Sequence, residues 1–153
     1  MMNKVLFNSV FENSLRILIL LDELSGPRTV DMLYNLDFLS VYGASLGISK
    51  DNLNGDNPYM FSEFAARRLL VQQALKELVL EGMALPMKLD SGIGYIITPD
   101  GEELATALDN QYAVRYRKIA RLAIKKCAGK NEREIIAAIN KKAAETFKRR
   151  DDG

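Results

Sequence analysis

The stretch from Phe61 to Thr98 constrains the fold of this chain more than any other part of the sequence. Its first two thirds have helical periodicity, and Gly82 is typical of the position just after a helix. Short apolar segments follow at residues 84–89 and 95–97, and the residues between them, 90–94, favour a turn. We therefore predict a long helix followed directly by a β-hairpin. The predicted buried face of this helix carries Phe64, Val71, Leu75, Leu78 and Val79.

Further helices are predicted on both sides of this unit. Thr29 and Thr98 are typical helix N-caps, and Asn8 or Ser9 is suited to cap the first helix. The last helix is predicted over residues 132–147, with a frayed end from Lys148. The apolar positions expected in the core are Leu15, Leu18, Ile19, Leu21, Leu24, Leu33, Tyr34, Leu36, Phe38, Leu39, Val41, Val114, Ile119, Leu122, Ala123, Ile135, Ile136, Ile139, Ala143 and Phe147.

These elements together indicate an α+β, mostly α fold. A helix followed by a hairpin is the second half of a winged helix, so we predict a winged-helix domain with a two-stranded wing at residues 1–109. A basic helical C-terminal extension is predicted at residues 110–153. The polar segment at residues 48–59 is long for a turn between two helices of such a domain. It is interpreted as a variable surface loop or as a binding loop.

The composition argues against most enzyme chemistry. The chain has no histidine and a single cysteine, which removes the commonest general base and the usual zinc ligands. The adjacent carboxylates Glu102–Glu103 and Asp151–Asp152 fit a helix N-terminus and a solvated tail better than a catalytic pair. We expect no catalytic, cofactor or metal site and no enzymatic activity. The apolar run at residues 15–21 contains Arg16 and is too short for a membrane span, so a cytoplasmic location is expected.

Charge is distributed unevenly along the sequence. Residues 1–110 contain 8 basic and 15 acidic residues, whereas residues 111–150 contain 13 basic and 3 acidic residues. This separation predicts two surfaces with different partners, although the two halves could also pair with each other. The residues expected to meet an acidic partner or DNA are Arg115, Lys118, Arg121 and Lys125. A solvated helix face is the alternative interpretation of the same residues.

Duplex binding by the predicted winged helix is disfavoured by its charge. The long helix has three cations, Arg67, Arg68 and Lys76, against the three acidic residues Glu63, Glu77 and Glu81. A duplex-binding face should neutralise several phosphates, so we predict a protein-docking module instead. Asp37, Arg67 and Arg68 are predicted as structural or interface residues, and one of the arginines could pair with Asp37 or Glu63.

The order and spacing of several segments resemble middle component 2 of the bacterial ABC-three-component systems. The resemblance covers roughly residues 7–126, and the final helix after Lys130 lies at or beyond its edge. The residues that carry it are Phe7, Asn8 and Ser9 with Glu12 and Arg16, Leu36 and Asp37 with Leu39, Glu63 with Arg67 and Arg68, and Gly82.

The resemblance implies a role without attached chemistry. Such middle components look like adaptors that link an SMC- or Rad50-like ABC ATPase to an effector, often a nuclease, in Lamassu-like anti-phage defence. It therefore implies a hetero-oligomer with these two partners, a DNA contact within the complex and no cofactor. We expect the interface to use the second helix, the long loop or the wing. The alternative hypothesis is a winged-helix DNA-binding transcription regulator.

Overall fold

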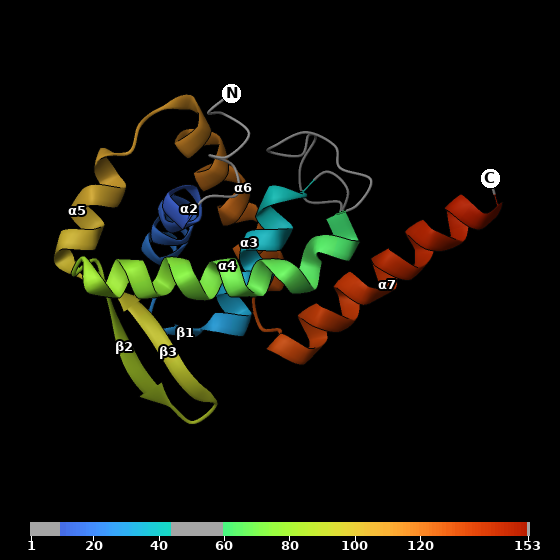
Figure 1. Ribbon diagram of the computed structural model, residues 1–153, viewed down its shortest axis with the longest axis horizontal. Helices are drawn as coiled ribbons and strands as arrows, with labels where there is room; N and C mark the ends of the chain where they lie inside the picture. The colour runs from blue at the N-terminus through green and yellow to red at the C-terminus, as the bar shows by residue number, and fades with distance from the viewer. Residues whose placement is uncertain (1–9, 44–59, 153) are drawn as a thin grey trace.

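The computed structural model describes residues 10–43 and 60–152, and this part of the chain is mostly helical with one small antiparallel sheet (Figure 1). The predicted α+β, mostly α class is confirmed. The predicted cap at Asn8 or Ser9 and the polar segment at residues 48–59 lie outside the described residues. In chain order the elements are α2 (Val10–Glu23), β1 (Arg28–Thr29), α3 (Val30–Val41), α4 (Met60–Leu80), β2 (Ala84–Leu89), β3 (Gly92–Ile97), α5 (Pro99–Ala107), α6 (Gln111–Cys127) and α7 (Glu132–Asp152).

The sheet contains the predicted hairpin and one strand that the sequence did not reveal. Its strand order is β1-β3-β2, with every neighbouring pair antiparallel. The predicted two-stranded hairpin is present as β2 and β3, and the sheet has a third strand because Arg28 and Thr29 pair with Tyr95 and Gly94. Strand β3 also begins earlier than predicted, since Leu89 pairs with Gly92. Only Asp90 and Ser91 then remain as the turn.

The predicted N-caps at Thr29 and Thr98 and the predicted end of the long helix before Gly82 are confirmed. The Thr29 and Thr98 side chains accept hydrogen bonds from the backbone N–H groups of Met32 and Gly101. At the end of α4, Gly82 has a φ of +77°, and the Met83 N–H donates to the Leu78 carbonyl at 2.8 Å. This is a Schellman-type ending, and it turns the chain directly into β2.

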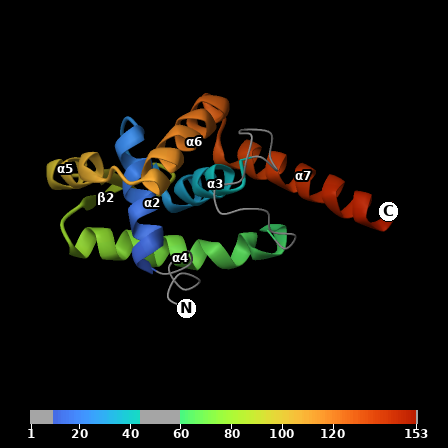
Figure 2. The same ribbon diagram turned by 90° about the horizontal axis from the view of Figure 1, so that it is seen from above.

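Helix α3 is the central helix of the described fold. It contacts α4 on one side and α6 on another, and the view from above places it between these two helices (Figure 2). Helix α2 also contacts both α4 and α6. Residues 33–41 of α3 are all buried, including the polar Asn35, Asp37 and Ser40. This central position brings polar groups from several helices into one interior.

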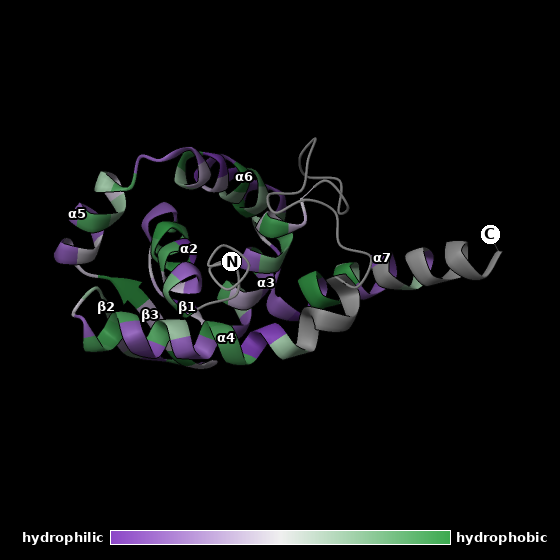
Figure 3. Ribbon diagram, turned by 45° about the horizontal axis from the view of Figure 1, so that its top comes forward, coloured by the Kyte–Doolittle hydropathy of each residue, from purple (hydrophilic) through white to green (hydrophobic). Residues whose placement is uncertain are grey.

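Most of the predicted core is confirmed. Residues from α2, α3, α4, α6 and α7 form one buried apolar cluster. Leu15, Val79 and Ile136 are only half-buried, and the side chains of Phe64, Ala143 and Phe147 lie outside the description. Green hydrophobic and purple hydrophilic residues alternate along α4 in Figure 3, as expected for a helix with one buried side.

The predicted core face of α6 is wrong in two positions. Val114 and Leu122 are 43% and 47% exposed. The helix instead turns Tyr116 and three alanines, Ala113, Ala120 and Ala123, toward α2 and α3. The buried face of α6 therefore combines these alanines with the larger side chains of Tyr116 and Ile119.

Helix α7 extends beyond the predicted end at residue 147 and runs to Asp152. Its first half packs on α3, with Ile135 and Ile139 buried, and its second half projects away from the other elements (Figure 1). The domain boundary between residues 109 and 110 stays a prediction. In the described part of the chain, α6 and α7 contribute to the same buried cluster as the helices before them.

Candidate functional site

A buried polar centre lies where α2, α3, α4 and α6 meet. Asp37 accepts hydrogen bonds at Oδ1 from Arg16 Nε, at 3.1 Å, and from the Tyr116 hydroxyl, at 2.8 Å. Its Oδ2 lies 3.5 Å from Arg67 Nη2. Arg16, Asp37 and Arg67 are 0%, 1% and 5% exposed. The pairing of Arg67 with Asp37 is therefore confirmed, and Arg16 and Tyr116 are partners that the sequence analysis missed.

Further polar contacts support the two guanidinium groups. Arg16 also donates to the Asn13 side-chain oxygen and, at 3.5 Å, to the Tyr112 hydroxyl. The Arg67 guanidinium carbon lies 5.7 Å from the centre of the Tyr42 ring, within cation–π range. These contacts matter because a charge taken out of water is stable only when it is paired and hydrogen-bonded.

Burial and neighbouring charges together determine which side chains of the centre are ionised. Burial alone would raise the pKa of Asp37, but Arg16 and Arg67 outweigh it and leave that pKa below its ordinary value. Burial, with Asp37 beside the ring, raises the pKa of the Tyr116 hydroxyl well above its ordinary value. Burial opposes the charge of Arg16, but Asp37, Tyr112 and Tyr116 together outweigh it and raise the pKa of this arginine. The carboxylate is thus ionised and the phenol is a neutral donor.

The signal for this centre was present in the sequence. Arg16 interrupts a run of apolar residues in a helix too short to cross a membrane, and a fully buried arginine requires an internal partner. Asp37 likewise lies among the apolar residues of α3. Tyr116 gave no such signal, because a tyrosine at helical spacing packs equally well without a buried partner.

The outer face of α4 has little free positive charge. Arg68 is paired with Asp31, at 2.7 Å between Nε and Oδ1, and both side chains are about two-fifths exposed. Leu69 and Leu80 are 60% and 70% exposed. They lie three helical turns apart on one stripe, which also carries the exposed residues Gln72, Gln73 and Lys76.

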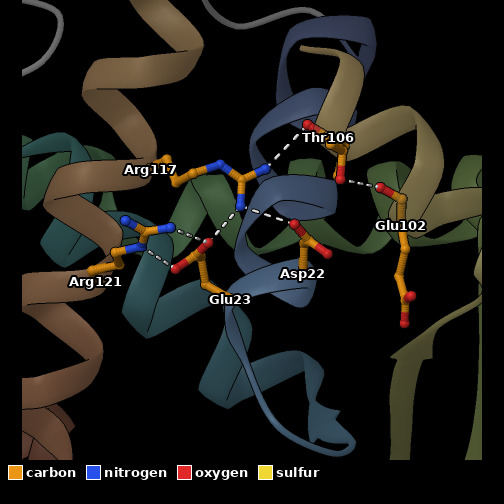
Figure 4. A network of polar contacts seen from close by, with 7 residues as sticks. Asp22, Glu23, Glu102, Thr106, Arg117 and Arg121 are labelled. Atoms are coloured by element: carbon orange, nitrogen blue, oxygen red, sulfur yellow. Dashed lines mark hydrogen bonds and ion pairs between the residues drawn. The ribbon is translucent and has the colours of Figure 1, made fainter. Parts of the chain in front are cut away.

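A group of ion pairs connects α6 to the end of α2 (Figure 4). Arg117 pairs with Asp22, at 2.8 Å, and with Glu23, and it donates at 3.0 Å to the Ala105 carbonyl of α5. Arg121 also pairs with Glu23. Burial favours the neutral acid, but Arg121 and Arg117 lower the pKa of Glu23 overall. Part of the charge asymmetry of the sequence is therefore neutralised within the molecule.

The predicted acidic-partner residues do not all share one environment. Arg115, Lys118 and Lys125 are exposed on the outer side of α6, as their spacing predicts. Arg121 is exposed too, but it is engaged with Glu23. Contact of these four residues with a partner or with DNA stays a prediction. A partner contact of Asp37, Arg67 or Arg68 also stays a prediction. Asp37 and Arg67 are buried in the structure.

Three segments were predicted for the interface: the second helix, the long loop and the wing. Among the described residues, the wing is the segment with exposed side chains. Residues 33–41 of α3 are buried, and the long loop lies outside the description. On the hairpin, Leu85, Met87 and Ile93 are 55%, 42% and 52% exposed. The wing therefore offers exposed apolar surface, and its exposed Lys88 and Asp90 balance in charge.

The described residues contain no group of three or more histidine, cysteine, aspartate or glutamate side chains arranged to hold a metal ion. Cys127 is half-buried, and burial raises the pKa of its thiol, so this thiol is not activated as a nucleophile. No described helix is long and apolar enough to cross a membrane. Enzymatic activity remains a matter for proposal.

The fold and its charges define a small, mostly helical chain with a buried, hydrogen-bonded polar centre and separate outer surfaces of different character. The family model of the ABC-three component (ABC-3C) system Middle Component 2 matches residues 6–149, and the chain belongs to this family. The match also corrects the expected extent of the resemblance, because it includes most of α7. Neither a search of curated proteins nor a search of solved structures found a match.

Proposed function

We propose that this chain is a non-catalytic adaptor subunit of a bacterial anti-phage defence complex. In that complex it links an SMC- or Rad50-like ABC ATPase to an effector, which we expect to be a nuclease. Membership of a middle-component family supports a role between other components of a three-component system. The absence of histidine from the sequence is consistent with a role that needs no acid–base chemistry.

The proposal includes a winged-helix assignment for the region from α2 to β3. The order α2-β1-α3-α4-β2-β3 and the sheet order β1-β3-β2 support it. In this assignment α4 occupies the position of a recognition helix, because it is the helix that leads into the hairpin. The character of its outer face then distinguishes a DNA reader from a protein-docking module.

The observation that carries the proposal is that both arginines of α4 are paired within the molecule. Arg67 forms a buried ion pair with Asp37, and Arg68 forms an ion pair with Asp31. The exposed stripe instead presents Leu69 and Leu80, with a single lysine between them. Tight duplex binding draws on several phosphate contacts by lysine and arginine, whereas exposed leucines stabilise a protein interface. We therefore assign this stripe to the contact with the ATPase.

The experiment is affinity purification from the native host through a tag after Gly153, with bound proteins identified by mass spectrometry. The test variant combines Leu69→Glu with Leu80→Glu. Its matched control combines Phe11→Glu with Leu104→Glu, which changes two exposed apolar residues on α2 and α5. Both variants must first show the far-UV circular dichroism and melting behaviour of the native chain.

We expect the native chain and the control to recover an ABC ATPase and an effector in fixed ratio, and the α4 variant to lose the ATPase. Recovery of the native chain alone, together with tight and base-discriminating duplex binding, would refute the adaptor role and favour a transcription regulator. Retention of both partners by the α4 variant would instead refute only the assignment of α4 as the contact face.

A further inference from the structure

A groove lies between the end of α6, the first half of α7 and the last turns of α3. Its volume is about 250 Å³. It is separate from the buried polar centre and from the exposed stripe of α4. The described residues that line it are Leu39, Lys126, Cys127, Lys130, Ile135, Ala138, Ile139, Lys141, Lys142 and Glu145.

The floor of the groove is apolar. Leu39, Ile135 and Ile139 are buried side chains of the central core, and they come from α3 and α7. Ala138 lies beside them on α7 and is exposed. A small exposed residue next to large buried ones leaves room for an apolar side chain from outside. Filling this space would remove apolar surface from water on both sides.

The rim of the groove is strongly positive. Four lysines line it, and Glu145 is the one acidic residue among the described lining residues. Glu145 lies 3.9 Å from Lys142, so its charge is already offset. Lys130, which follows α6, and Lys141, which lies on α7, are both exposed lining residues. The groove therefore combines an apolar floor with a surplus of positive charge.

The positive rim continues along the outer side of α6. Lys125 precedes the rim residue Lys126, and Lys118 lies two turns earlier on the same side as Lys125. Leu122 lies between these lysines and is 47% exposed. The same alternation of charge and apolar surface thus extends beyond the groove.

We propose that this groove binds an acidic amphipathic helix of a partner protein. Apolar side chains of that helix would fill the floor, and its carboxylates would meet the lysines of the rim. DNA accounts for the lysines but not for the floor, because duplex phosphates present no apolar side chain to a groove. The identity of the partner as a component of the same defence complex rests on the proposed function, whereas the binding chemistry does not.

Fluorescence anisotropy with the isolated full chain tests the inference at physiological salt. The probe is a labelled synthetic helix of about 18 residues, or ~27 Å, with leucine every third or fourth position and glutamate elsewhere. Three competitors are compared with it: the same residues in scrambled order, polyglutamate of equal length and a short DNA duplex. We expect the amphipathic helix to bind at least about tenfold more tightly than each of the others.

Two variants separate groove filling from charge. Ala138→Arg adds positive charge but places a long side chain over the floor, so binding of the amphipathic helix should weaken about tenfold. Any ligand held by charge alone should bind this variant equally well or better. Lys130→Glu with Lys141→Glu should weaken the same helix by a similar factor. Its control, Lys76→Glu with Lys88→Glu, makes the same change in net charge on α4 and the wing.

Equal binding of polyglutamate, tighter binding of the duplex, or unchanged helix binding by the Ala138→Arg variant would each overturn the inference. A second copy of the chain as the occupant would appear as concentration-dependent dimerisation that Ala138→Arg abolishes, and this result would overturn it too. Because no other component is present, failure here leaves the adaptor role standing. Conversely, failure of the native chain to recover the ATPase from the host would refute the adaptor role but would leave the proposed binding chemistry of the groove unaffected.

Discussion

Asp37 is the residue on which four helices converge. Its carboxylate lies on α3 and binds Arg16 of α2, Arg67 of α4 and Tyr116 of α6. Two guanidinium groups share one carboxylate in an interior where none of the three is more than 5% exposed. Such a centre contributes less to net stability than to holding one arrangement of helices, since each charge is costly to bury.

Replacement of Asp37 by alanine should be strongly destabilising. It leaves two buried arginines without their carboxylate, and breaking a buried pair from one side costs about 3–5 kcal/mol. Urea unfolding followed by circular dichroism measures the loss. Asp31→Ala is the control, because its exposed pair with Arg68 should contribute only about 0–1 kcal/mol. Equal effects of the two variants would contradict the importance assigned to the buried centre.

The same carboxylate predicts a dependence of stability on pH. The pKa of Asp37 is lowered in the folded chain, whereas the unfolded value is about 3.9. Its ionised form therefore stabilises the fold fully above about pH 4, and this contribution is lost as pH falls toward the folded pKa. The difference in unfolding free energy between the native chain and Asp37→Asn should shrink as pH falls below about 4. A difference that stays constant under acid conditions would contradict this interpretation.

At the residue scale, sequence reasoning reached this centre in part. It gave Asp37 as one possible partner of Arg67 or Arg68, beside Glu63, and the structure selects Asp37 for Arg67. Tyr116 could not be paired in advance, because its hydrogen bond with Asp37 depends on the packing of α6 against α3.

Among the elements, β1 shows why short strands escape prediction. Its two residues have no periodicity of their own, and their pairing depends on β3, which lies far along the chain. The hairpin was predictable because its turn and its apolar strands are neighbours in sequence. The helix caps at Thr29 and Thr98 were predictable for the same reason.

Gly101 of α5 provides a test of how closely this helix packs. A Cβ there would overlap the Met83 carbonyl oxygen and lie 2.7 Å from Ile97 Cγ1. Glycine to alanine within a helix normally stabilises by about 1 kcal/mol. Here Gly101→Ala should instead lower the unfolding free energy by about 1–3 kcal/mol, because α5 must move away from the sheet. Thermal or urea unfolding decides the sign of the change.

Glu103→Ala is the matched control, since Glu103 is exposed on the same helix and should change stability by no more than about 0.5 kcal/mol. Stabilisation by Gly101→Ala would show that α5 has room to shift and is not fixed against Met83.

For the whole molecule, the distribution of charge matters more than the net charge of +1. Glu23 and Asp22 neutralise Arg117 and Arg121, while Arg115, Lys118 and Lys125 remain on the outside of α6. The sequence predicted the asymmetry and left open how much of it was internal. The sequence could not show that Arg117 and Arg121 pair within the molecule while Arg115 stays on the outside. Those pairs depend on where α2 ends in the fold.

This arrangement predicts weak and unspecific DNA binding by the isolated chain. Among the described residues, exposed positive charge is concentrated on the outer side of α6 and at the rim of the groove. Affinity should therefore lie in the non-specific range, about 10⁻⁴–10⁻⁶ M at physiological salt. Anisotropy titrations with duplexes of different sequence measure it. Arg115→Glu with Lys118→Glu should weaken this binding for all sequences alike. Nanomolar binding of one sequence would contradict the assignment of α4 to protein docking.

The most direct test of the adaptor role is native mass spectrometry of the purified chain with the ABC ATPase and the effector that the proposal gives it as partners. We predict that the ATPase and the effector form a joint assembly of fixed stoichiometry only when this chain is present. Assembly of the ATPase and the effector to the same extent without the chain would contradict the proposal that it links them.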